Sequence, residues 1–370
     1  MYLSTRYQSG ASVLRDMTYL IAILYGLTGC HLEEAPKINP AHPPFCGGVS
    51  IERPECARPW LPYIGQVPLG GRWELSHSEY QDVRVGIADD PDAQTPKQWL
   101  ETSELVFDQL GYIKVFVEVN QESNTSDSAS STFAPCEPQR FSHVYEVVAE
   151  YSAHAEAPDS EAISMSDPRL IAWAQAISSV EYGPHVSAQF QVEDHALGAA
   201  GDESFDVLSL GRGGQVTFYF EEGIANGPGP DFAVFENSFN DRFLELARVD
   251  VSTDGVHFVS IPHSYLGEEP LGAFGEHDPT LIHGLAGKYK AGYGTPFDLS
   301  TLAWSREAQV GSLDLHAVHY VRVVDIVGDG LFTDSFLHPV YDPYPTQGSA
   351  GIDIDAIGIM YTPDAAPCPQ

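Results

Sequence analysis

The sequence NGPGPDFAVFENSF, which begins at Asn226, places oxygen-bearing side chains at both ends of a short apolar run. Its two prolines fix the backbone φ angle and remove two N–H donors, so the loop before Asp231 is stiff and cannot join a sheet ladder. The apolar run predicts a strand, which ends at Glu236 and Asn237. Because calcium takes roughly six to eight oxygen ligands, the pattern predicts Asp231, Glu236 and Asn237 as calcium ligands.

More acidic residues lie near the carboxyl terminus. In GIDIDAIGI, strand alternation predicts Asp353 and Asp355 on one face and Ile352, Ile354 and Ala356 on the other. Two such carboxylates repel each other unless they are solvated, protonated or bridged by a cation. We therefore add Asp325, Asp353 and Asp355 as candidate calcium ligands. The alternative is that these aspartates cap turns and face water. The preceding segment carries four aspartates: Asp325, Asp329, Asp334 and Asp342.

A third candidate site is the segment GLAGKYKAGYGTPFDLS at 284–300, which is unusually rich in lysine and tyrosine for this chain. Lys288, Tyr289 and Tyr293 are candidate ligand-binding residues, because tyrosine rings stack on sugars and the lysine attracts anions. The alternative is that the lysines offset nearby carboxylates and the tyrosines cover the core.

The composition narrows the classes of function. The chain of 370 residues has 18 Lys and Arg against 52 Asp and Glu, so its net charge of −34 argues against nucleic acid as a partner. The G-x-S-x-G, H-E-x-x-H and complete phosphate-loop motifs are absent. A pair of carboxylates for glycoside hydrolysis stays possible, since the sequence does not give their separation.

The amino terminus predicts export. An apolar run from Leu20 to Leu27 is too short to span a bilayer and fits the core of a signal peptide. Leu-Thr-Gly-Cys follows, which resembles a bacterial lipobox, so residues 1–30 are expected to be a signal and Cys30 the lipidated residue. The expected location is the bacterial outer membrane or cell surface, with membrane contact through the lipid anchor only. An ordinary signal peptide or a membrane-proximal helix is the alternative.

Four further cysteines are disulfide candidates, because an even number in an exported chain is typical of disulfides. Three pairings are possible among them, and no C-x-x-C pair favours a metal site. The candidates are Cys46, Cys56, Cys136 and Cys368.

The remaining pattern predicts an all-β protein with two β domains. Residues 31–152 read as a proline-rich tether and a small β domain, and residues 153–370 as an antiparallel jelly-roll β-sandwich. One helix is expected between or beside them, in SDPRLIAWAQAISS at 166–179, where Leu170, Trp173 and Ile177 share a helical stripe. Strands are expected over 187–192 and in the apolar runs that follow.

Four stretches resemble a family of secreted bacterial cell-surface proteins of largely unknown function. They lie at 208–258, 284–300, 320–330 and 340–358, and include GPGPDFAVFEN and YDPYPTQGSAGIDIDAIG. More distantly, VDVSTDGVHFVSI at 249–261 is similar to discoidin-type, galactose-binding-like domains. That similarity implies a β-sandwich that binds glycans, lipids or proteins through loops at one end, often beside a structural calcium.

Together these features predict a noncatalytic cell-surface lipoprotein. Its expected partner is an extracellular glycan or surface protein, bound through the loops of a calcium-stabilised β-sandwich. An extracellular hydrolase acting on polysaccharide and a purely structural surface-layer component are the alternatives.

Overall fold

The computed structural model describes residues 66–74, 83–100, 104–119, 139–201, 206–303 and 305–364. The candidate signal segment, Cys30 and the four disulfide candidates lie outside these ranges, so lipidation and disulfide formation stay predictions. In the described ranges, no helix is long and apolar enough to cross a membrane.

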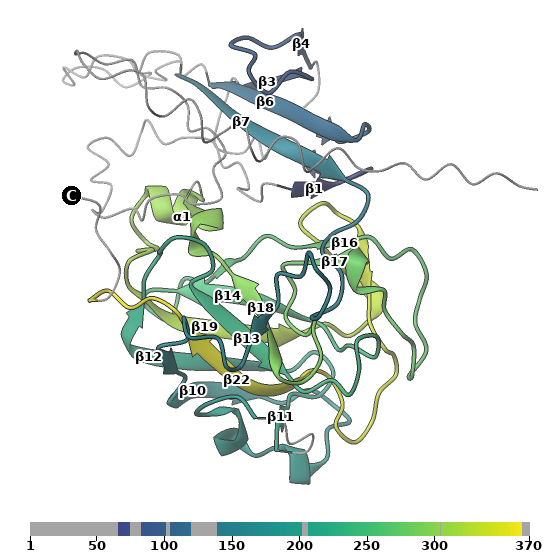
Figure 1. The fold of residues 1–370 in the computed structure, drawn as a ribbon, viewed down its shortest axis with the longest axis vertical. Coiled ribbons are helices and arrows are strands. Elements are labelled where there is room, and N and C mark those ends of the chain that lie inside the picture. The colour runs from purple at the N-terminus through teal and green to yellow at the C-terminus, as the bar shows by residue number, and fades with distance from the viewer. Residues whose placement is uncertain are drawn as a thin grey trace, which may run out of the picture. The chain divides into compact units, whose positions relative to one another are not determined.

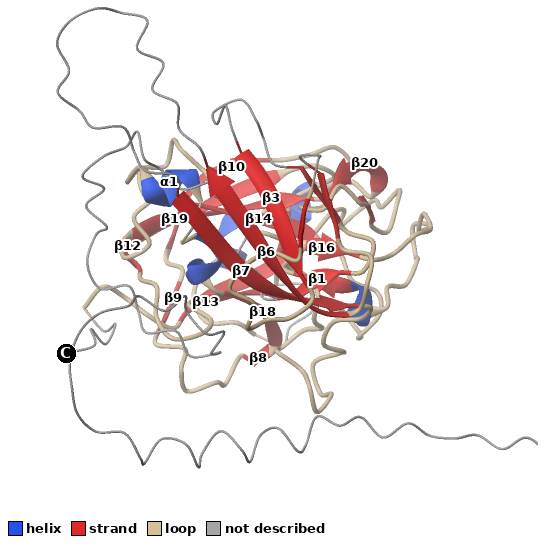
Figure 2. Cartoon of the chain, turned by 90° about the horizontal axis from the view of Figure 1, so that it is seen from above, coloured by secondary structure: helices blue, strands red, loops and turns tan. Residues whose placement is uncertain are grey.

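The described chain is all-β, as the sequence predicts. Strands and loops make up most of it, and the helical segments are short (Figure 2). Nearly all strand pairs are antiparallel, with β1 and β7 forming a parallel pair.

Two antiparallel sheets form a β-sandwich (Figure 1). The first has the order β10-β12-β19-β14-β15, and the second has the order β11-β22-β13-β18-β8, with β9 also paired to β22. The strands of the first sheet are β10 (Ala176–Glu181), β12 (Gln215–Ile224), β14 (Ala247–Ser252), β15 (Val259–Ser260) and β19 (Val318–Asp325). The strands of the second are β8 (Ile163–Ser164), β9 (Ala172–Trp173), β11 (Leu208–Ser209), β13 (Phe232–Glu236), β18 (Tyr293–Phe297) and β22 (Asp353–Ile359).

Alternate residues of both sheets bury the same hydrophobic core. Val249 and Val251 of β14 and Val321 and Val323 of β19 point inward from the first sheet, as the period of two requires. Side chains of the second sheet complete this core, among them Phe232, Val234, Ile354 and Ile357. The antiparallel β-sandwich is therefore confirmed, while its jelly-roll connectivity stays a prediction.

A further five-stranded sheet, in the order β1-β7-β6-β3-β4, lies within the range predicted as a small β domain. It has its own apolar cluster, which Phe336 from the carboxyl-terminal half joins by an edge contact with Phe107. The division at residue 152 stays a prediction. The strands are β1 (Gln66–Pro68), β3 (Val83–Ala88), β4 (Gln98–Trp99), β6 (Gly111–Val119) and β7 (Gln139–Val148).

Three two-stranded ribbons and five short helical segments complete the described elements. The ribbons pair β2 (Arg72–Glu74) with β5 (Glu104–Val106), β16 (Ser264–Tyr265) with β17 (Ile282–His283), and β20 (Asp329–Thr333) with β21 (Pro339–Tyr341). The helical segments are α1 (Arg306–Gln309) and the 3-10 helices η3 (Ala188–Phe190), η4 (Glu193–Ala196), η5 (Pro279–Leu281) and η6 (Leu299–Leu302).

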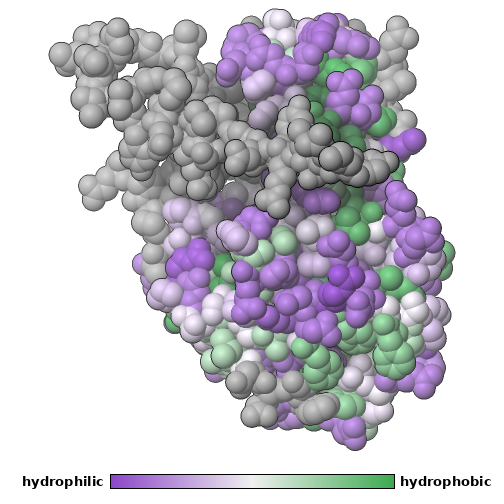
Figure 3. All heavy atoms as spheres, turned by 45° about the vertical axis from the view of Figure 1, so that its right-hand side comes forward, coloured by the Kyte–Doolittle hydropathy of each residue, from purple (hydrophilic) through white to green (hydrophobic). Residues whose placement is uncertain are grey.

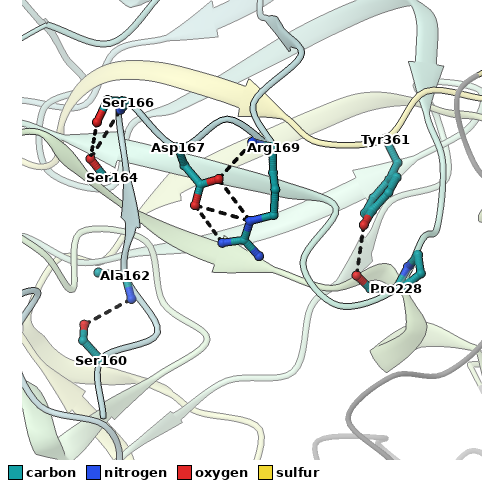
Figure 4. Close-up of polar contacts among 8 residues, drawn as sticks. All are labelled: Ser160, Ala162, Ser164, Ser166, Asp167, Arg169, Pro228 and Tyr361. Atoms are coloured by element: carbon teal, nitrogen blue, oxygen red, sulfur yellow. Dashed lines mark hydrogen bonds and ion pairs between the residues drawn. The ribbon is translucent and has the colours of Figure 1, made fainter. Parts of the chain in front are cut away.

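The helix predicted over 166–179 is wrong. Asp167 and Arg169 form a turn instead. The Asp167 carboxylate accepts hydrogen bonds from the backbone N–H of Arg169 at 2.9 Å and from its guanidinium at 2.8 Å (Figure 4). The chain then continues as β9 and β10. Ala172 and Ala174 pack on the sandwich core, whereas Trp173 packs on Phe235 on the other side of the sheet. Both faces of this strand are covered, so apolar residues occur at neighbouring positions, and their spacing in the sequence resembles that of one apolar helix face.

The strand predicted over 187–192 is also wrong, because the 3-10 helix η3 occupies it. Ser187 N donates to Gly348 O in a loop, and no residue of η3 is buried. The surface shown in Figure 3 is mostly hydrophilic, with smaller apolar patches, as expected for so acidic a chain.

Candidate functional site

Five acidic side chains come together at one end of the sandwich, and we call them the acidic cluster. They come from the ends of β13 and β19, the starts of β14 and β22, and the loop after β21. The members are Glu236, Glu245, Asp325, Asp342 and Asp353.

Antiparallel pairing explains why these residues meet. Glu236 ends β13 opposite Ile354, one residue into β22. Asp325 ends β19 opposite Ala247, the first residue of β14. The end of one strand and the start of its antiparallel neighbour lie at the same edge of a sheet. The cluster therefore joins the two sheets of the sandwich at a single end.

The cluster is removed from water. Glu236, Glu245, Asp325 and Asp342 are only 2–5% exposed, and Asp353 is partly buried. Burial raises the pKa of each of the five carboxyls, to about 7 for Asp353. Repulsion from other members raises the pKa of Glu236, Glu245 and Asp325 further. Such carboxyls become charged at neutral pH only at a large cost, unless a cation joins them.

Backbone N–H groups hold parts of the cluster in place. Asp325 accepts from Gly213 N and from Ile352 N, each at 2.7 Å. Asp342 Oδ1 accepts from Leu246 N at 3.0 Å, which ties the loop after β21 to the start of β14. Glu236 accepts from Ser238 N at 2.9 Å, and Asp353 accepts from the Ser209 hydroxyl.

Glu245 differs from the other four. Among the residues that the structure describes, no N–H or O–H group donates a hydrogen bond to its carboxylate. The charged groups that shift its pKa are the other four carboxylates of the cluster. A carboxylate only 5% exposed, with four other carboxylates raising its pKa, is the member of the cluster that a cation would stabilise most.

Glycines allow the backbone to approach the cluster closely. Gly328, at φ +82°, packs so tightly that a Cβ there would lie 2.6 Å from Asp342 O. Gly351, at φ +71°, leaves room for Asp325 Oδ1, which a Cβ would meet at 2.6 Å. Both positions combine a left-handed backbone with a close approach, so both require glycine.

Asp355 does not join the cluster, although it is two residues from Asp353. The register between β13 and β22 shifts at this point, so that Phe235 pairs with Ala356 and Glu236 with Ile354. Asp355 is the extra residue of the resulting β-bulge. Its carboxylate accepts from Gly201 N at 2.9 Å, and burial raises its pKa to about 6. Asp355 thus has its own hydrogen-bond partner away from the cluster, and the shared face of Asp353 and Asp355 stays a prediction.

Asp231 lies at the opposite end of β13 from Glu236, about 17 Å away at roughly 3.3 Å per residue. Its two oxygens accept from Gly227 N at 2.6 Å and from Leu299 N at 2.7 Å. Burial and the nearby Asp298 raise its pKa. Asp231 therefore clamps the Gly-Pro loop to η6, and it cannot share an ion with Glu236. Tyr361 adds a second clamp by donating to Pro228 O at 3.2 Å (Figure 4).

Asn237 borders the cluster, since its backbone N–H donates to Asp353 O at 3.2 Å. The donor set is all oxygen, which fits calcium better than zinc or copper. In the described ranges, no three His, Cys, Asp or Glu side chains are already arranged around a metal position. A cation would therefore require the carboxylates that are not held by several N–H groups, Glu245 above all, to turn toward it.

The structure places the predicted ligand-binding residues inside the protein. Lys288 and Tyr289 are each 2% exposed, and Tyr293 is partly buried. Lys288 donates to Ser152 Oγ at 3.0 Å, and Lys290 pairs with Glu156 at 2.7 Å. This placement favours the alternative for Lys290, which offsets a nearby carboxylate, and for Tyr289, which is buried.

Sequence reasoning did not select Glu245 or Asp342 as ligands. Glu245 lies at the start of a predicted strand, and Asp342 follows the short strand β21. Both are therefore acidic residues at strand ends, which is the same pattern that selected Glu236. If the antiparallel pairing of β14 with β19 had been known, it would have placed the start of β14, next to Glu245, beside Asp325.

No protein-family model matches this chain, and no curated protein matches it either. The resemblance to secreted cell-surface proteins and to discoidin-type domains therefore stays a prediction.

Proposed function

We propose that the β-sandwich is a noncatalytic, calcium-stabilised module that binds an extracellular glycan or another surface molecule. The observation that carries this proposal is the acidic cluster. Its five carboxylates lie together, burial raises the pKa of each, and repulsion within the cluster raises the pKa values of Glu236, Glu245 and Asp325 further.

The charges of the cluster support a divalent cation. Coulomb repulsion between carboxylates grows as water is excluded, and a bound ion converts that repulsion into attraction. Calcium accepts irregular sets of roughly six to eight oxygens, whereas magnesium needs nearly ideal octahedral geometry and keeps several waters. A crowded and irregular set of carboxylates therefore favours calcium over magnesium.

The position of the cluster supports a role in ordering loops. An ion shared by Glu236, Glu245 and Asp342 would connect β13, the start of β14 and the loop after β21. The segments 237–246 and 326–352 leave the sandwich at this end. Calcium would hold them in one arrangement, and an ordered set of loops binds its ligand with a smaller entropy loss.

The burial of the cluster weighs against the hydrolase alternative. Four of the five side chains are at most 5% exposed, so a polysaccharide chain has no contact with them. A single ion can occupy such a site where a sugar cannot. The proposed module belongs to an exported lipoprotein, with Cys30 as the anchor and the bacterial outer membrane or cell surface as its location.

The test of this function is a glycan array probed with the chain from residue 31 onward, in millimolar calcium and in excess chelator. Calcium-dependent binding to a defined glycan class supports the proposal. The matched variant is Glu245→Gln, which keeps the shape of the side chain and removes its charge. Binding that is unchanged in chelator and in Glu245→Gln would contradict a calcium-dependent module.

A further inference from the structure

Lys288 is a second unusual charge, and it lies outside the acidic cluster. Its side chain is 2% exposed, and in the described part of the chain no carboxylate forms an ion pair with it. Its one hydrogen bond there is to Ser152 Oγ, at 3.0 Å. Nζ also lies over the Tyr289 ring, 5.4 Å from its centroid, so both of its direct partners are neutral, and a buried ammonium group with neutral partners is costly for the fold.

The surroundings of this amine make its neutral form accessible. Burial lowers the pKa of Lys288 to about 8, although the carboxylates of Glu161 and Asp159 oppose the shift. His283 also lies within electrostatic reach of Lys288, and burial lowers the pKa of that imidazole. The amine therefore loses its proton close to neutral pH, where an exposed lysine stays charged.

Ser152 has two further polar neighbours. Tyr289 Oη lies 3.2 Å from Ser152 Oγ, and in this structure the Ser152 hydroxyl donates to Glu161 Oε2 at 3.3 Å. Burial raises the pKa of Tyr289 to about 12, so its hydroxyl stays protonated and can donate. Ser152 itself is only partly buried, whereas Lys288 is 2% exposed.

The protonation state of Lys288 sets the direction of its hydrogen bond. The ammonium form must donate to Ser152 Oγ, which withdraws electron density from that oxygen. The neutral amine has a lone pair, so Ser152 can donate to Nζ instead and becomes a better nucleophile.

We propose that Ser152 and Lys288 form a nucleophile–base pair that accepts an acyl group from an activated carboxylic ester. Ser152 Oγ forms the new bond to the carbonyl carbon, and its proton passes to Lys288 Nζ. The ester C–O bond then breaks, and the departing oxygen takes the proton from Nζ. The products are an acylated Ser152 and the free alcohol, so atoms and charge balance without a further reactant.

The test uses p-nitrophenyl acetate as the probe, with intact-mass measurement and peptide mapping between about pH 6 and about pH 10. We expect a single acetyl group on Ser152, with a labelling rate that rises through about pH 8. Lys288→Met should slow labelling at least roughly 100-fold, the usual contribution of a positioned base. Ser152→Ala should remove the adduct.

Controls separate this chemistry from a purely structural role. Lys290→Met removes the lysine two residues away, which pairs with Glu156, and should leave labelling unchanged. Thermal unfolding of Lys288→Met checks that the variant is folded. Labelling that is absent at about pH 10, spread equally over other serines, or unchanged in a folded Lys288→Met protein would overturn the proposal. None of these outcomes depends on calcium.

Discussion

The imidazole of His277 lies against the acidic cluster, with Nε2 3.2 Å from Asp342 Oδ1 and both side chains buried. Burial lowers the pKa of His277 to about 4, so the ring is neutral at physiological pH. When Asp342 is ionised, as in a calcium-bound cluster, it can only accept, so Nε2 of the neutral ring then carries the proton and donates. His277 thus orients one carboxylate of the cluster without adding a positive charge.

Replacing His277 should therefore weaken calcium binding. We expect His277→Leu to raise the calcium Kd by about 10- to 100-fold, the usual effect of removing a partner that orients a metal ligand. His277→Gln keeps an N–H donor and should fall between wild type and His277→Leu. Calcium titration calorimetry on both variants measures this, and equal affinity in wild type and His277→Leu would contradict the positioning role.

The β-bulge in β22 predicts different effects for its two aspartates. Asp353 belongs to the cluster, whereas Asp355 accepts from Gly201 N away from it. Asp353→Asn should weaken calcium binding at least roughly 10-fold, since a charged ligand is lost. Asp355→Asn should leave the affinity within about 2-fold of wild type and lower stability by about 1 kcal/mol through its weakened hydrogen bond. Equal losses of affinity would show that the bulge does not separate the two side chains.

The glycine at 328 should be needed for the site as well as for the fold. Gly328→Ala places a methyl group against the Asp342 backbone and should lower the free energy of unfolding by about 1–3 kcal/mol and weaken calcium binding. Gly348 is the matched control, because it has φ +93° and a Cβ added there would meet no atom within 4 Å. Gly348→Ala should cost only the backbone strain and leave calcium affinity unchanged. Chemical denaturation with and without calcium compares the two variants.

The stability of the metal-stripped protein and the stabilising effect of calcium should depend on pH in opposite directions. A carboxyl whose pKa is raised by folding stabilises the protein fully below about pH 4, and that contribution is lost as the pH rises through the folded value. Burial raises the pKa values of all five cluster carboxyls, that of Asp353 to about 7. The Tm of the metal-stripped protein should therefore fall between about pH 5 and about pH 8.

Calcium binds the ionised carboxylates, so its stabilising effect should grow over the same range of pH. Differential scanning calorimetry at several pH values, with calcium or with chelator, measures both trends. Magnesium at equal concentration is the control for ionic strength. A calcium-induced rise in Tm that shrinks with increasing pH would contradict the linkage.

The sandwich could be predicted because its strands carry local signals. Val249 and Val251 of β14 and Val321 and Val323 of β19 are each separated by one polar residue, and each pair points into the core. The segment at 166–179 shows the limit of such signals. Ala172 and Trp173 pack on opposite faces, and two covered faces produce the same apolar spacing as one helical stripe.

The site was only partly predictable for a different reason. Glu236 and Asp353 could be selected because each lies at the end of a strong strand pattern. The positions of Glu245 and Asp342 in the cluster depend on which strands pair, and the position of Asp355 outside it depends on a bulge. A single sequence carries no local pattern that predicts either feature. The sequence does not distinguish Asp231 from a calcium ligand, because the same residue type serves loop clamping as well as calcium binding.

Calcium titration calorimetry on the metal-stripped chain from residue 31 tests the central claim most directly. The acidic cluster predicts saturable calcium binding that Glu245→Gln weakens at least roughly 100-fold, because Glu245 is the buried carboxylate without a donor. Asp231→Asn is the control, since its oxygens already accept backbone N–H groups, and it should bind calcium like wild type. No calcium binding, or wild-type affinity in Glu245→Gln, would contradict the assignment of this cluster as a calcium site.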